Sequence, residues 1–296
     1  MPIKTINDIA HSSSEKYTDL LNWFKSKNSR VMIALSGGVD SAFVAMAARQ
    51  ALGKEKILTA TANYKTLAKE ELEVAKKIAK EIDVDHIMIE YDELANPNFV
   101  KNDSLRCFHC RNELADNLLR VAKEEKIELI VDGSQIDDLE DYRPGMTALH
   151  QKGICSPLIE AGLNKLEIRY LAKANNLSVY DKPSNSCLAS RIPHGSEVTL
   201  LKLKKIENSE SVIKNISKFR NLRVRDHGDL ARIEIDKKEF TKILNPETLQ
   251  DLVTNLKNKG YKYVTLDLEG YRSNKNDYSI DTEIDNIDPD GSNDRK

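Results

Sequence analysis

Short continuous runs of apolar residues alternate along the chain with longer stretches in which apolar residues recur at helical spacing. The short runs are typical of strands buried on both faces, and the longer stretches are typical of amphipathic helices. Strands are predicted at 31–35, 57–62, 85–90 and 128–132, and helices at 15–28, 41–52, 67–82, 111–125 and 164–175. This alternation favours an α/β fold with a doubly wound parallel sheet, in which ligands bind beyond the carboxyl ends of the strands.

The pattern changes at about residue 198, where a Lys-rich helix is predicted over 199–218. Two alternating runs follow at 222–225 and 230–235, and the turn residues between them predict a hairpin. A helix near 246–257 and a strand at 261–268 complete a smaller C-terminal α+β domain. The predicted division is a first domain over 1–180, a cysteine-bearing loop over 181–197, the α+β domain over 198–272 and an acidic disordered tail over 273–296.

The balance of charge excludes a global attraction to nucleic acid or to an anionic membrane, because 45 Lys and Arg residues meet 47 Asp and Glu residues. Basic residues gather only locally, between Lys202 and Arg225. No apolar run approaches the ~20 residues that a membrane-spanning helix needs, and the N-terminus lacks the apolar core of a signal peptide. Four cysteines in 296 residues do not make a disulfide framework, so we expect a cytoplasmic protein.

The segment 36–41 has the sequence SGGVDS and stands between a predicted strand and a predicted helix. Two glycines let backbone N–H groups approach an anion, and the start of the helix adds unpaired donors. Asp40 would repel a phosphate unless a cation such as Mg²⁺ intervened. An ordinary glycine turn is the alternative interpretation. The candidate nucleotide-binding residues of the segment are Ser36, Gly37, Gly38, Asp40 and Ser41.

Three cysteines stand in polar segments and are candidate ligands or nucleophiles. Cys107 and Cys110 form a CxxC pair immediately before a predicted helix, whose positive end would lower the pKa of a thiol. Cys187 lies in a predicted loop bounded by prolines. Spacing alone leaves open a zinc half-site, a redox pair or an iron–sulfur site with one open iron. Cys155 is flanked by apolar residues and is expected to be a core thiol rather than a fourth ligand.

Resemblance to known families narrows these interpretations. SGGVDS resembles the PP-loop of the ATP pyrophosphatases, which cleave ATP between the α- and β-phosphates and pass AMP to a substrate. Further motifs follow in order: RCFHC from Arg106, DGS from Asp132, DYRPG from Asp141, CLASRIPHG from Cys187 and RVRDHGDLAR from Arg223. Over residues 15–272 the chain resembles the ATP-dependent sulfur transferases of nickel-pincer nucleotide biosynthesis, the pathway that makes the cofactor of lactate racemase.

The resemblance implies a reaction and the roles of several residues. A carboxylate of a pyridinium biscarboxylate mononucleotide is adenylylated by ATP, and a sulfur nucleophile then displaces AMP to give a thiocarboxylate. The PP-loop, with Mg²⁺ helped by Asp40, would hold and polarise the phosphates. The positions implied for the nucleotide site are Arg111, Gly133, Asp141 and Arg143, and those for the substrate phosphate are Arg223 and Arg225.

Cys187 matches the sulfur-bearing cysteine of that family. In the single-cysteine branch this residue gives up its own sulfur and becomes dehydroalanine, so each chain works once. A second branch carries three cysteines and is proposed to hold a [4Fe–4S] cluster whose open iron binds hydrosulfide. Because this chain also has Cys107 and Cys110, we favour the cluster over the sacrificial cysteine. The family's tendency to self-associate favours a homo-oligomer.

Three other functions share part of this pattern. A PP-loop tRNA thiolase would also use ATP, a CxxC pair and a cluster, but the chain is slightly acidic and shows no recognisable RNA-binding module. An amide-forming synthetase that uses ammonia would have no use for the three cysteines together. A non-enzymatic iron–sulfur carrier would release no pyrophosphate from ATP. The expected partners are therefore a small nucleotide substrate and sulfide or another sulfur donor, without nucleic acid or membrane.

Overall fold

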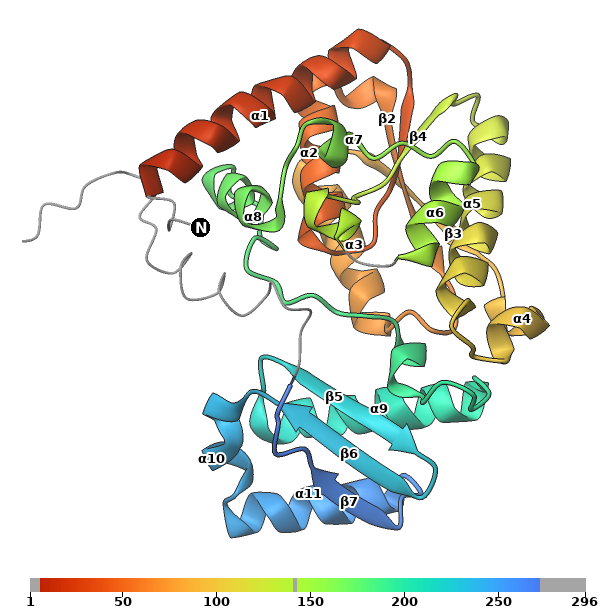
Figure 1. The fold of residues 1–296 in the computed structure, drawn as a ribbon, viewed down its shortest axis with the longest axis vertical. Coiled ribbons are helices and arrows are strands. Elements are labelled where there is room, and N and C mark those ends of the chain that lie inside the picture. The colour runs from red at the N-terminus through yellow and green to blue at the C-terminus, as the bar shows by residue number, and fades with distance from the viewer. Residues whose placement is uncertain (1–5, 141–142, 272–296) are drawn as a thin grey trace, which may run out of the picture.

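A four-stranded parallel sheet lies at the centre of the larger part of the molecule (Figure 1). The structure is a computed structural model that describes residues 6–140 and 143–271. The sheet has the order β3-β2-β1-β4, and each neighbouring pair is parallel. The strands are β1 Val31–Ala34, β2 Ile57–Asn63, β3 Asp85–Glu90 and β4 Leu129–Val131. The predicted α/β fold with a parallel sheet is confirmed.

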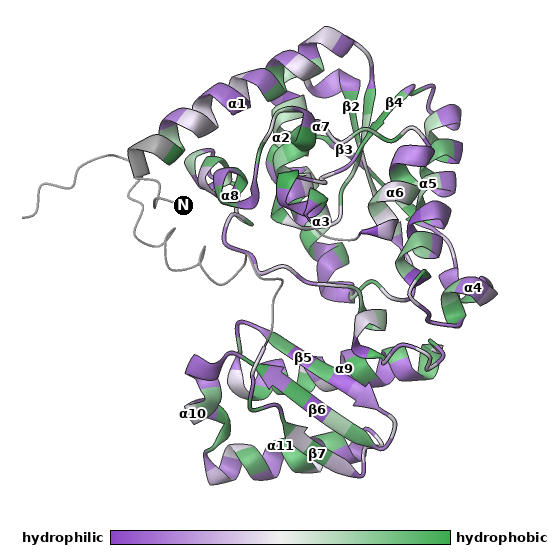
Figure 2. Ribbon diagram, in the orientation of Figure 1, coloured by the Kyte–Doolittle hydropathy of each residue, from purple (hydrophilic) through white to green (hydrophobic). Residues whose placement is uncertain are grey.

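Helices cover both faces of this sheet. They are α1 Ile6–Lys27, α2 Val39–Leu52, α3 Lys69–Ile82, α4 Pro97–Val100, α5 Arg106–Glu124, α6 Pro144–Gln151, α7 Pro157–Glu160 and α8 Lys165–Ala174. Val31 and Ile33 of β1 join a hydrophobic cluster with α1, α2, α3 and α8, whereas Met32 joins a second cluster with α5. Burial on both faces explains the continuous apolar run of β1. Figure 2 shows the apolar strands and the apolar α2 inside, with polar residues on the outer helices.

A smaller three-stranded sheet with its own hydrophobic cluster forms the lower part of Figure 1. Its elements are α9 Leu200–Ser217, β5 Leu222–His227, β6 Leu230–Ile235, α10 Phe240–Ile243, α11 Pro246–Asn258 and β7 Tyr263–Leu266. Strands β5 and β6 form the predicted antiparallel hairpin, and β7 pairs with β6 in parallel. The separate clusters support the predicted domain limits, which we keep as a proposal.

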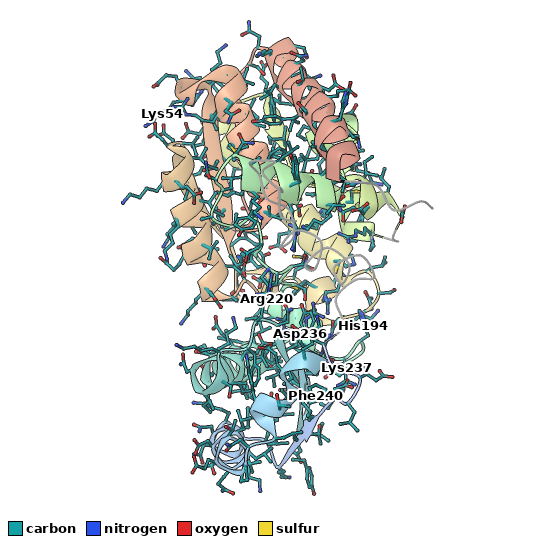
Figure 3. The ribbon with its side chains drawn as sticks, turned by 90° about the vertical axis from the view of Figure 1, so that its left-hand side faces the viewer. Lys54, His194, Arg220, Asp236, Lys237 and Phe240 are labelled. Atoms are coloured by element: carbon teal, nitrogen blue, oxygen red, sulfur yellow. The ribbon has the colours of Figure 1, made fainter. Side chains whose placement is uncertain are left out.

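The chain between α8 and α9 joins the two parts and carries a short 3₁₀ turn, Leu188–Arg191. A hydrophobic cluster at this junction combines Phe99 of α4, Leu188 of the turn and Leu203 of α9. Figure 3 places His194, on the same connection, at the level where the two parts meet. The connection is therefore buried at Leu188, Ala189, Arg191 and Ile192, whereas residues 184–186 and 194–195 are exposed.

Several element boundaries differ from those predicted. Helix α5 begins at Arg106 rather than at 111, so the CxxC pair lies on the helix instead of before it. The short helices α4, α6 and α7 each begin with a proline, and they are too short for an apolar pattern to reveal. The capping box of Asn164 and Glu167 at the start of α8 is confirmed. The acidic tail predicted over 273–296 lies outside the described residues.

The thiols and the helices bear on two expectations from composition. All four cysteines are free thiols, as expected of a chain without a disulfide framework. Among residues 6–140 and 143–271, no helix combines the length and the apolar character that crossing a membrane requires.

Candidate active site

The loop between β1 and α2 is folded around its own serine hydroxyls. Ser41 Oγ accepts a hydrogen bond from the Ser36 N–H at 3.1 Å and lies 3.1 Å from Ser36 Oγ. Gly37 adopts φ +82°, a left-handed conformation that favours glycine, and a Cβ there would lie 2.8 Å from the Glu71 carbonyl oxygen. The loop thus brings the N–H groups at the start of α2 to the carboxyl edge of the sheet, where a phosphate is favoured.

Lys182, from the connection after α8, holds this loop from outside. Its Nζ donates to the Gly37 carbonyl oxygen at 2.8 Å and pairs with Glu71 at 2.6 Å. Asn185 donates to the other carboxylate oxygen of Glu71 at 3.1 Å. The segment that leads to Cys187 therefore runs beside the PP-loop.

Gly133, which follows β4, touches the start of α2. A Cβ at this position would lie 2.7 Å from the Ser41 nitrogen, a separation that real Cβ atoms essentially never show. The preceding Asp132 accepts hydrogen bonds from the N–H and the hydroxyl of Ser134 and from the hydroxyl of Ser156, at 2.7 to 3.1 Å. The structure thus places Gly133 beside the PP-loop in a turn that is fixed by hydrogen bonds.

Asp40 lies among cations and other carboxylates. Its Oδ2 pairs with Lys165 Nζ at 2.6 Å, and its Oδ1 is buried and accepts no hydrogen bond from the residues that the structure describes. Nearby, Asp138 pairs with Arg143 at 2.5 Å. Burial raises the pKa of Asp138, and the negative charge of Asp40 adds to the shift. The predicted nucleotide-site residue Asp141 lies outside the described residues.

Arg111 lies among aromatic rings and thiols. Tyr64 and Tyr91 stack with their ring centroids 5.6 Å apart, and Arg111 interacts electrostatically with both. It also interacts with Cys110 and with Asp132. Burial raises the pKa of both tyrosines, so their hydroxyls stay protonated at neutral pH. Arg111 itself is exposed to solvent and can meet an anion at this rim.

The structure brings the three candidate thiols together from two distant segments. Cys107 and Cys110 lie three residues apart in the first turns of α5. The Leu188 N–H donates to the Thr66 carbonyl oxygen at 2.9 Å, which fixes the neighbouring Cys187 beyond the carboxyl end of β2. Cys110 interacts electrostatically with both other thiols. Within the described part of the chain, no group of three or more His, Cys, Asp or Glu side chains is arranged to hold a metal ion.

The expectation that the helix end lowers the thiol pKa is wrong for Cys110. Burial raises the pKa of this thiol to about 12; the Arg111 guanidinium opposes the shift, and the Cys187 thiol adds to it. Cys107 is exposed, and Arg106 donates a long hydrogen bond of 3.8 Å to its sulfur. Cys155 packs against the main hydrophobic cluster, as expected of a core thiol, but it is only partly buried.

Arg191 is a buried residue that shapes the loop around Cys187. Its side chain is 1% exposed and pairs with Glu210 of α9 through Nε at 2.9 Å and Nη2 at 3.3 Å. Its Nη1 donates to the carbonyl oxygens of Ser186 and Cys187, at 2.6 and 3.2 Å. One guanidinium therefore ties the cysteine-bearing loop to the C-terminal part.

The two arginines predicted for the substrate phosphate have different surroundings. Arg225 makes a bidentate pair with Glu234 at 2.9 and 3.0 Å and donates to the Ser190 carbonyl oxygen at 2.7 Å. Arg223 lies with its guanidinium carbon 4.4 Å from the ring centre of Tyr271, and burial lowers its pKa. Arg225 also lines a cavity of about 420 Å³, which is basic because its walls include Arg106, Arg191, Arg232, His194 and His227.

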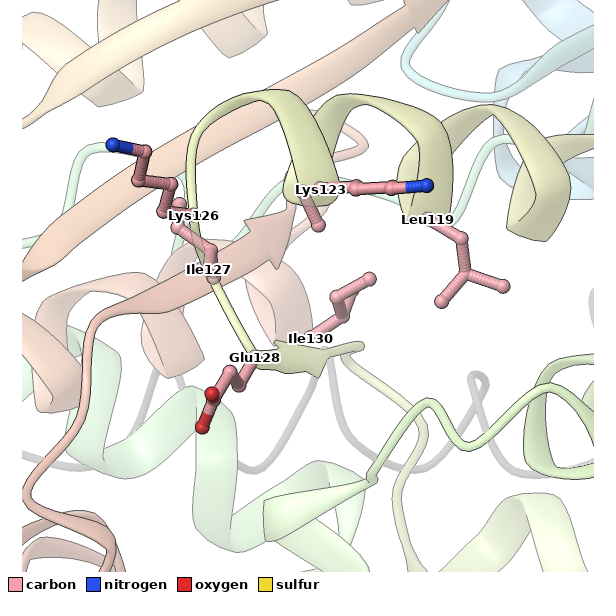
Figure 4. Close-up of a pocket in the computed structure, with 7 residues that line it drawn as sticks. Leu119, Lys123, Lys126, Ile127, Glu128 and Ile130 are labelled. Carbon is pink, nitrogen blue, oxygen red and sulfur yellow. The ribbon is translucent and has the colours of Figure 1, made fainter.

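Another cavity lies at the opposite, N-terminal end of β4. It measures about 510 Å³ and is mainly apolar (Figure 4). Its walls include Leu119, Lys123, Lys126, Ile127, Glu128 and Ile130. None of the predicted site residues lines it, so the candidate chemistry gathers at the other edge of the sheet.

Two lysines that contact the PP-loop region were not predicted from the sequence. Lys165 pairs with Asp40, and Lys182 contacts Gly37. A signal existed for Lys165, because it directly follows the helix-capping Asn164 and a cation is unfavourable at the positive end of a helix. Lys182 stands in an irregular segment, and no sequence pattern marks it.

The fold and the loop define the class of protein: an α/β enzyme with a PP-loop at the carboxyl edge of its sheet. The NAD synthase family matches residues 17–118, from α1 into α5. The NH(3)-dependent NAD(+) synthetase of Pyrococcus horikoshii is 37% identical over 84 residues, which are 28% of this chain and 32% of that protein.

Longer similarities extend into the C-terminal part. An uncharacterized protein of Synechocystis is 39% identical over 261 residues, 88% of this chain and 97% of the relative. The pyridinium-3,5-bisthiocarboxylic acid mononucleotide synthase of Lactiplantibacillus plantarum is 30% identical over 247 residues, 83% of this chain and 88% of that enzyme. The chain belongs to the family of this synthase, and it is an ATP-using sulfur transferase, as its motifs predicted.

Proposed function

We propose that this enzyme adenylylates a carboxylate of a pyridinium biscarboxylate mononucleotide and then replaces AMP with sulfur. The observation that carries the proposal is that the segment leading to Cys187 contacts the PP-loop, through Lys182 and Gly37, before its backbone is anchored at Thr66. A thiol and a nucleotide loop therefore share one rim of the sheet. The name of the Lactiplantibacillus relative supports this acceptor and this product.

In this proposal the phosphates of ATP bind at the start of α2. Donors come from Ser36, Gly37, Gly38 and Ser41, and Gly133 keeps the neighbouring turn close to them. Asp40 would hold Mg²⁺, and its buried Oδ1, which accepts no hydrogen bond from the described residues, fits a cation. When bound, Mg²⁺ neutralises charge on the phosphates.

Two arginines and an aspartate complete the proposed nucleotide site. Arg111 is exposed at the rim and interacts with Asp132, which precedes Gly133. Arg143 is 39% exposed beside Asp138. A guanidinium suits phosphate because it can donate two parallel hydrogen bonds. Asp141 is retained in this site on the strength of the family motif alone.

The proposed chemistry has two steps. A carboxylate oxygen of the substrate attacks the α-phosphorus of ATP, a P–O bond forms, and pyrophosphate leaves with the electron pair of the broken bond. AMP is then a much better leaving group than oxide, so a sulfur nucleophile can attack the carbonyl carbon. A C–S bond forms, AMP departs with the electron pair of the C–O bond, and a thiocarboxylate remains.

The three thiols would supply the sulfur in one of two ways. A [4Fe–4S] cluster held by Cys107, Cys110 and Cys187 would leave one iron open to bind hydrosulfide. The donor set fits this cluster in chemistry, because cysteine thiolates are the usual ligands of iron–sulfur clusters. In the described ranges these side chains are not arranged as a group of metal ligands.

The alternative uses only Cys187 itself. Its thiolate would attack the acyl-adenylate and release AMP. Loss of the α-proton would then break the Cβ–S bond, and the electron pair of that bond would leave with the thiocarboxylate. Dehydroalanine would remain at position 187, and the chain would be lighter by one H₂S.

We further propose that the basic cavity at Arg225 receives the phosphate of the mononucleotide. His227, which also lines it, has its pKa lowered by burial and by the charge of Arg232. Arg223 packs against Tyr271 instead, which makes Arg225 the better supported of the two.

The test uses the full-length protein under anaerobic conditions with ATP, Mg²⁺ and the pyridinium biscarboxylate mononucleotide. We expect pyrophosphate release that depends on the mononucleotide, and a product in which sulfur replaces a carboxylate oxygen, seen by mass spectrometry. Iron and sulfide in the purified protein would identify the cluster, whereas loss of H₂S from the chain after one turnover would identify the sacrificial cysteine. Pyrophosphate release that requires tRNA instead would contradict the proposal.

The partners in this proposal are the small mononucleotide and a sulfide donor. A homo-oligomer in the cytoplasm stays a prediction, which the elution volume of the purified protein and its location in fractionated cells would check.

A further inference from the structure

Lys165 occupies a place in the fold that is electrostatically unfavourable for a lysine. It is the first residue of α8, directly after the N-cap Asn164, where the helix presents its positive end. Its side chain is only 12% exposed, and its Nζ lies 2.6 Å from Asp40 Oδ2. The ion pair with Asp40 compensates the unfavourable position and holds this ammonium in the PP-loop region.

The backbone of Lys165 is fixed while its side chain is long. Its N–H donates to Asp137 at 2.9 Å, and the cap below it is closed by Glu167, which also pairs with Lys16. The side chain has four rotatable bonds beyond this anchored backbone. Its ammonium can therefore change partners over a few ångströms without any movement of α8.

The ammonium of Lys165 and a divalent cation require the same carboxylate. Asp40 has one oxygen engaged by Lys165 and one buried oxygen with no hydrogen bond from the residues described. Mg²⁺ prefers anionic oxygen ligands and keeps the rest of its shell in water and phosphate oxygens. Full engagement of Asp40 by the metal would leave the ammonium in need of another anion, and ATP would bring one to the same rim.

We propose that Lys165 occupies the cation position at Asp40 in the nucleotide-free enzyme and moves to a phosphate oxygen of ATP when Mg²⁺ takes its place. The ammonium keeps its proton throughout, and only ionic contacts and hydrogen bonds are exchanged. This inference rests on the proposed ATP site, but it does not depend on the sulfur acceptor. In consequence, Lys165 opposes metal binding in the absence of nucleotide and supports nucleotide binding in the presence of metal.

The neighbouring charges indicate how the loss of Lys165 would change metal and nucleotide binding. Asp137 and Asp138 lie close to the Asp40–Lys165 pair, and Arg143 pairs with Asp138. Removal of the ammonium would leave Asp40 without its ion pair, beside Asp137 and Asp138, while Arg143 would stay paired with Asp138. A divalent cation should then bind more tightly, while the polyanionic nucleotide should bind less tightly.

The experiment measures binding to the full-length protein and requires no turnover. Mn²⁺ binding without nucleotide is followed by electron paramagnetic resonance, and ATP binding with Mg²⁺ is followed by calorimetry. For Lys165→Met we expect Mn²⁺ to bind about 10-fold more tightly and ATP at least about 10-fold more weakly, as for loss of one close charge pair. Lys152→Met is the matched control, because it removes a lysine that pairs with Asp116 at 2.6 Å on the surface; we expect it to change neither affinity.

Two further variants make each outcome decisive. Asp40→Asn should abolish the Mn²⁺ site both alone and with Lys165→Met, and Lys165→Arg should restore ATP affinity in part. Unchanged Mn²⁺ affinity in Lys165→Met would overturn the proposal, and so would tighter Mn²⁺ with unchanged ATP affinity. If the wild-type protein bound no ATP, the proposed function and the transfer of Lys165 to phosphate would fail together. If it bound ATP but did not thiolate the mononucleotide, only the acceptor would be wrong.

Discussion

The PP-loop and the junction that carries Cys187 are built in opposite ways. Within the PP-loop itself the contacts that shape the turn join residues that are close in sequence, such as Ser36 and Ser41. At the junction they join distant residues, as when Arg106 donates to the Ala189 carbonyl oxygen across 83 positions. The geometry of a local motif can therefore be predicted from the sequence. For a site built from distant segments, the sequence shows only which residue types are available.

The difference is clearest for positive charge. The junction is rich in arginine, but Arg191 and Arg225 each form two contacts with an internal carboxylate, Glu210 and Glu234 respectively. In the PP-loop region Arg111 is exposed. A count of basic residues thus overstates the charge that the junction can offer to a ligand, because much of it neutralises buried acids.

The sharpest way to separate the two regions is Cys187→Ala. We expect formation of the thiocarboxylate to fall by roughly 10³-fold or more, as for loss of a nucleophile elsewhere. Pyrophosphate release in a single turnover should persist, because the PP-loop is untouched. Mass spectrometry of the product and a pyrophosphate assay measure the two steps. Cys155→Ala, at the thiol that packs against the main cluster, is the control and should keep both. Loss of both activities in Cys187→Ala would show that the regions are not separable.

Arg191→Met tests how far the junction depends on one buried charge. Removing one partner of a buried ion pair should lower the free energy of unfolding by about 3–5 kcal/mol, since Glu210 is left unpaired. Chemical denaturation measures this change. Arg120→Met removes an exposed arginine that pairs with Glu124, and it should change the free energy by less than about 1 kcal/mol. Equal effects of the two variants would argue against the structural role of Arg191.

Gly133→Ala probes the contact between β4 and the PP-loop. The added Cβ would meet the Ser41 nitrogen at 2.7 Å, so the start of α2 must shift, and ATP affinity should fall by about 10²-fold. Calorimetry measures the affinity. Gly153→Ala is the control, because φ +80° strains the new residue while its Cβ meets nothing within 4 Å. It should lose stability but keep ATP affinity, and equal loss of affinity in both variants would contradict the contact.

The smallest expected effect compares two thiols on one helix. The raised pKa of Cys110, about 12, leaves it almost wholly protonated at pH 8, so iodoacetamide should modify it at least about 10-fold more slowly than the exposed Cys107. Because the pKa is raised, the rate at Cys110 should climb with each unit of pH toward that value. Site-resolved mass spectrometry of the metal-free protein measures both rates. Equal rates at pH 8 would contradict the burial of Cys110.

Much of the fold could be predicted because its signals are local. The apolar run of β1, the glycines of segment 36–41 and the capping box at Asn164 each specify their own backbone. The start of α5 could not be predicted, because its first residue is held by a distant contact: Arg106 donates to the Ala189 carbonyl oxygen. The raised pKa of Cys110 was hidden for the same reason, since burial by other segments outweighs the helix end.

In the candidate site, too, local contacts could be predicted from the sequence and distant contacts could not. Ser36, Gly37 and Ser41 were expected to meet in one loop, and they do. Lys165 and Lys182 reach that loop from segments more than a hundred residues away, and a single sequence gives no pairing information for them. Of the two arginines of β5, Arg225 lines the basic cavity and Arg223 does not. The alternation of residues along a strand could not predict this difference, because it depends on the partners of each side chain.

The hydrogen bond between the Leu188 N–H and the Thr66 carbonyl oxygen joins two segments of backbone, so it does not depend on the side chain of the neighbouring residue 187. The backbone at position 187 is consequently held in place by this contact, which does not depend on the side chain at that position. Selenocysteine installed there would have its backbone fixed at the same point by this hydrogen bond.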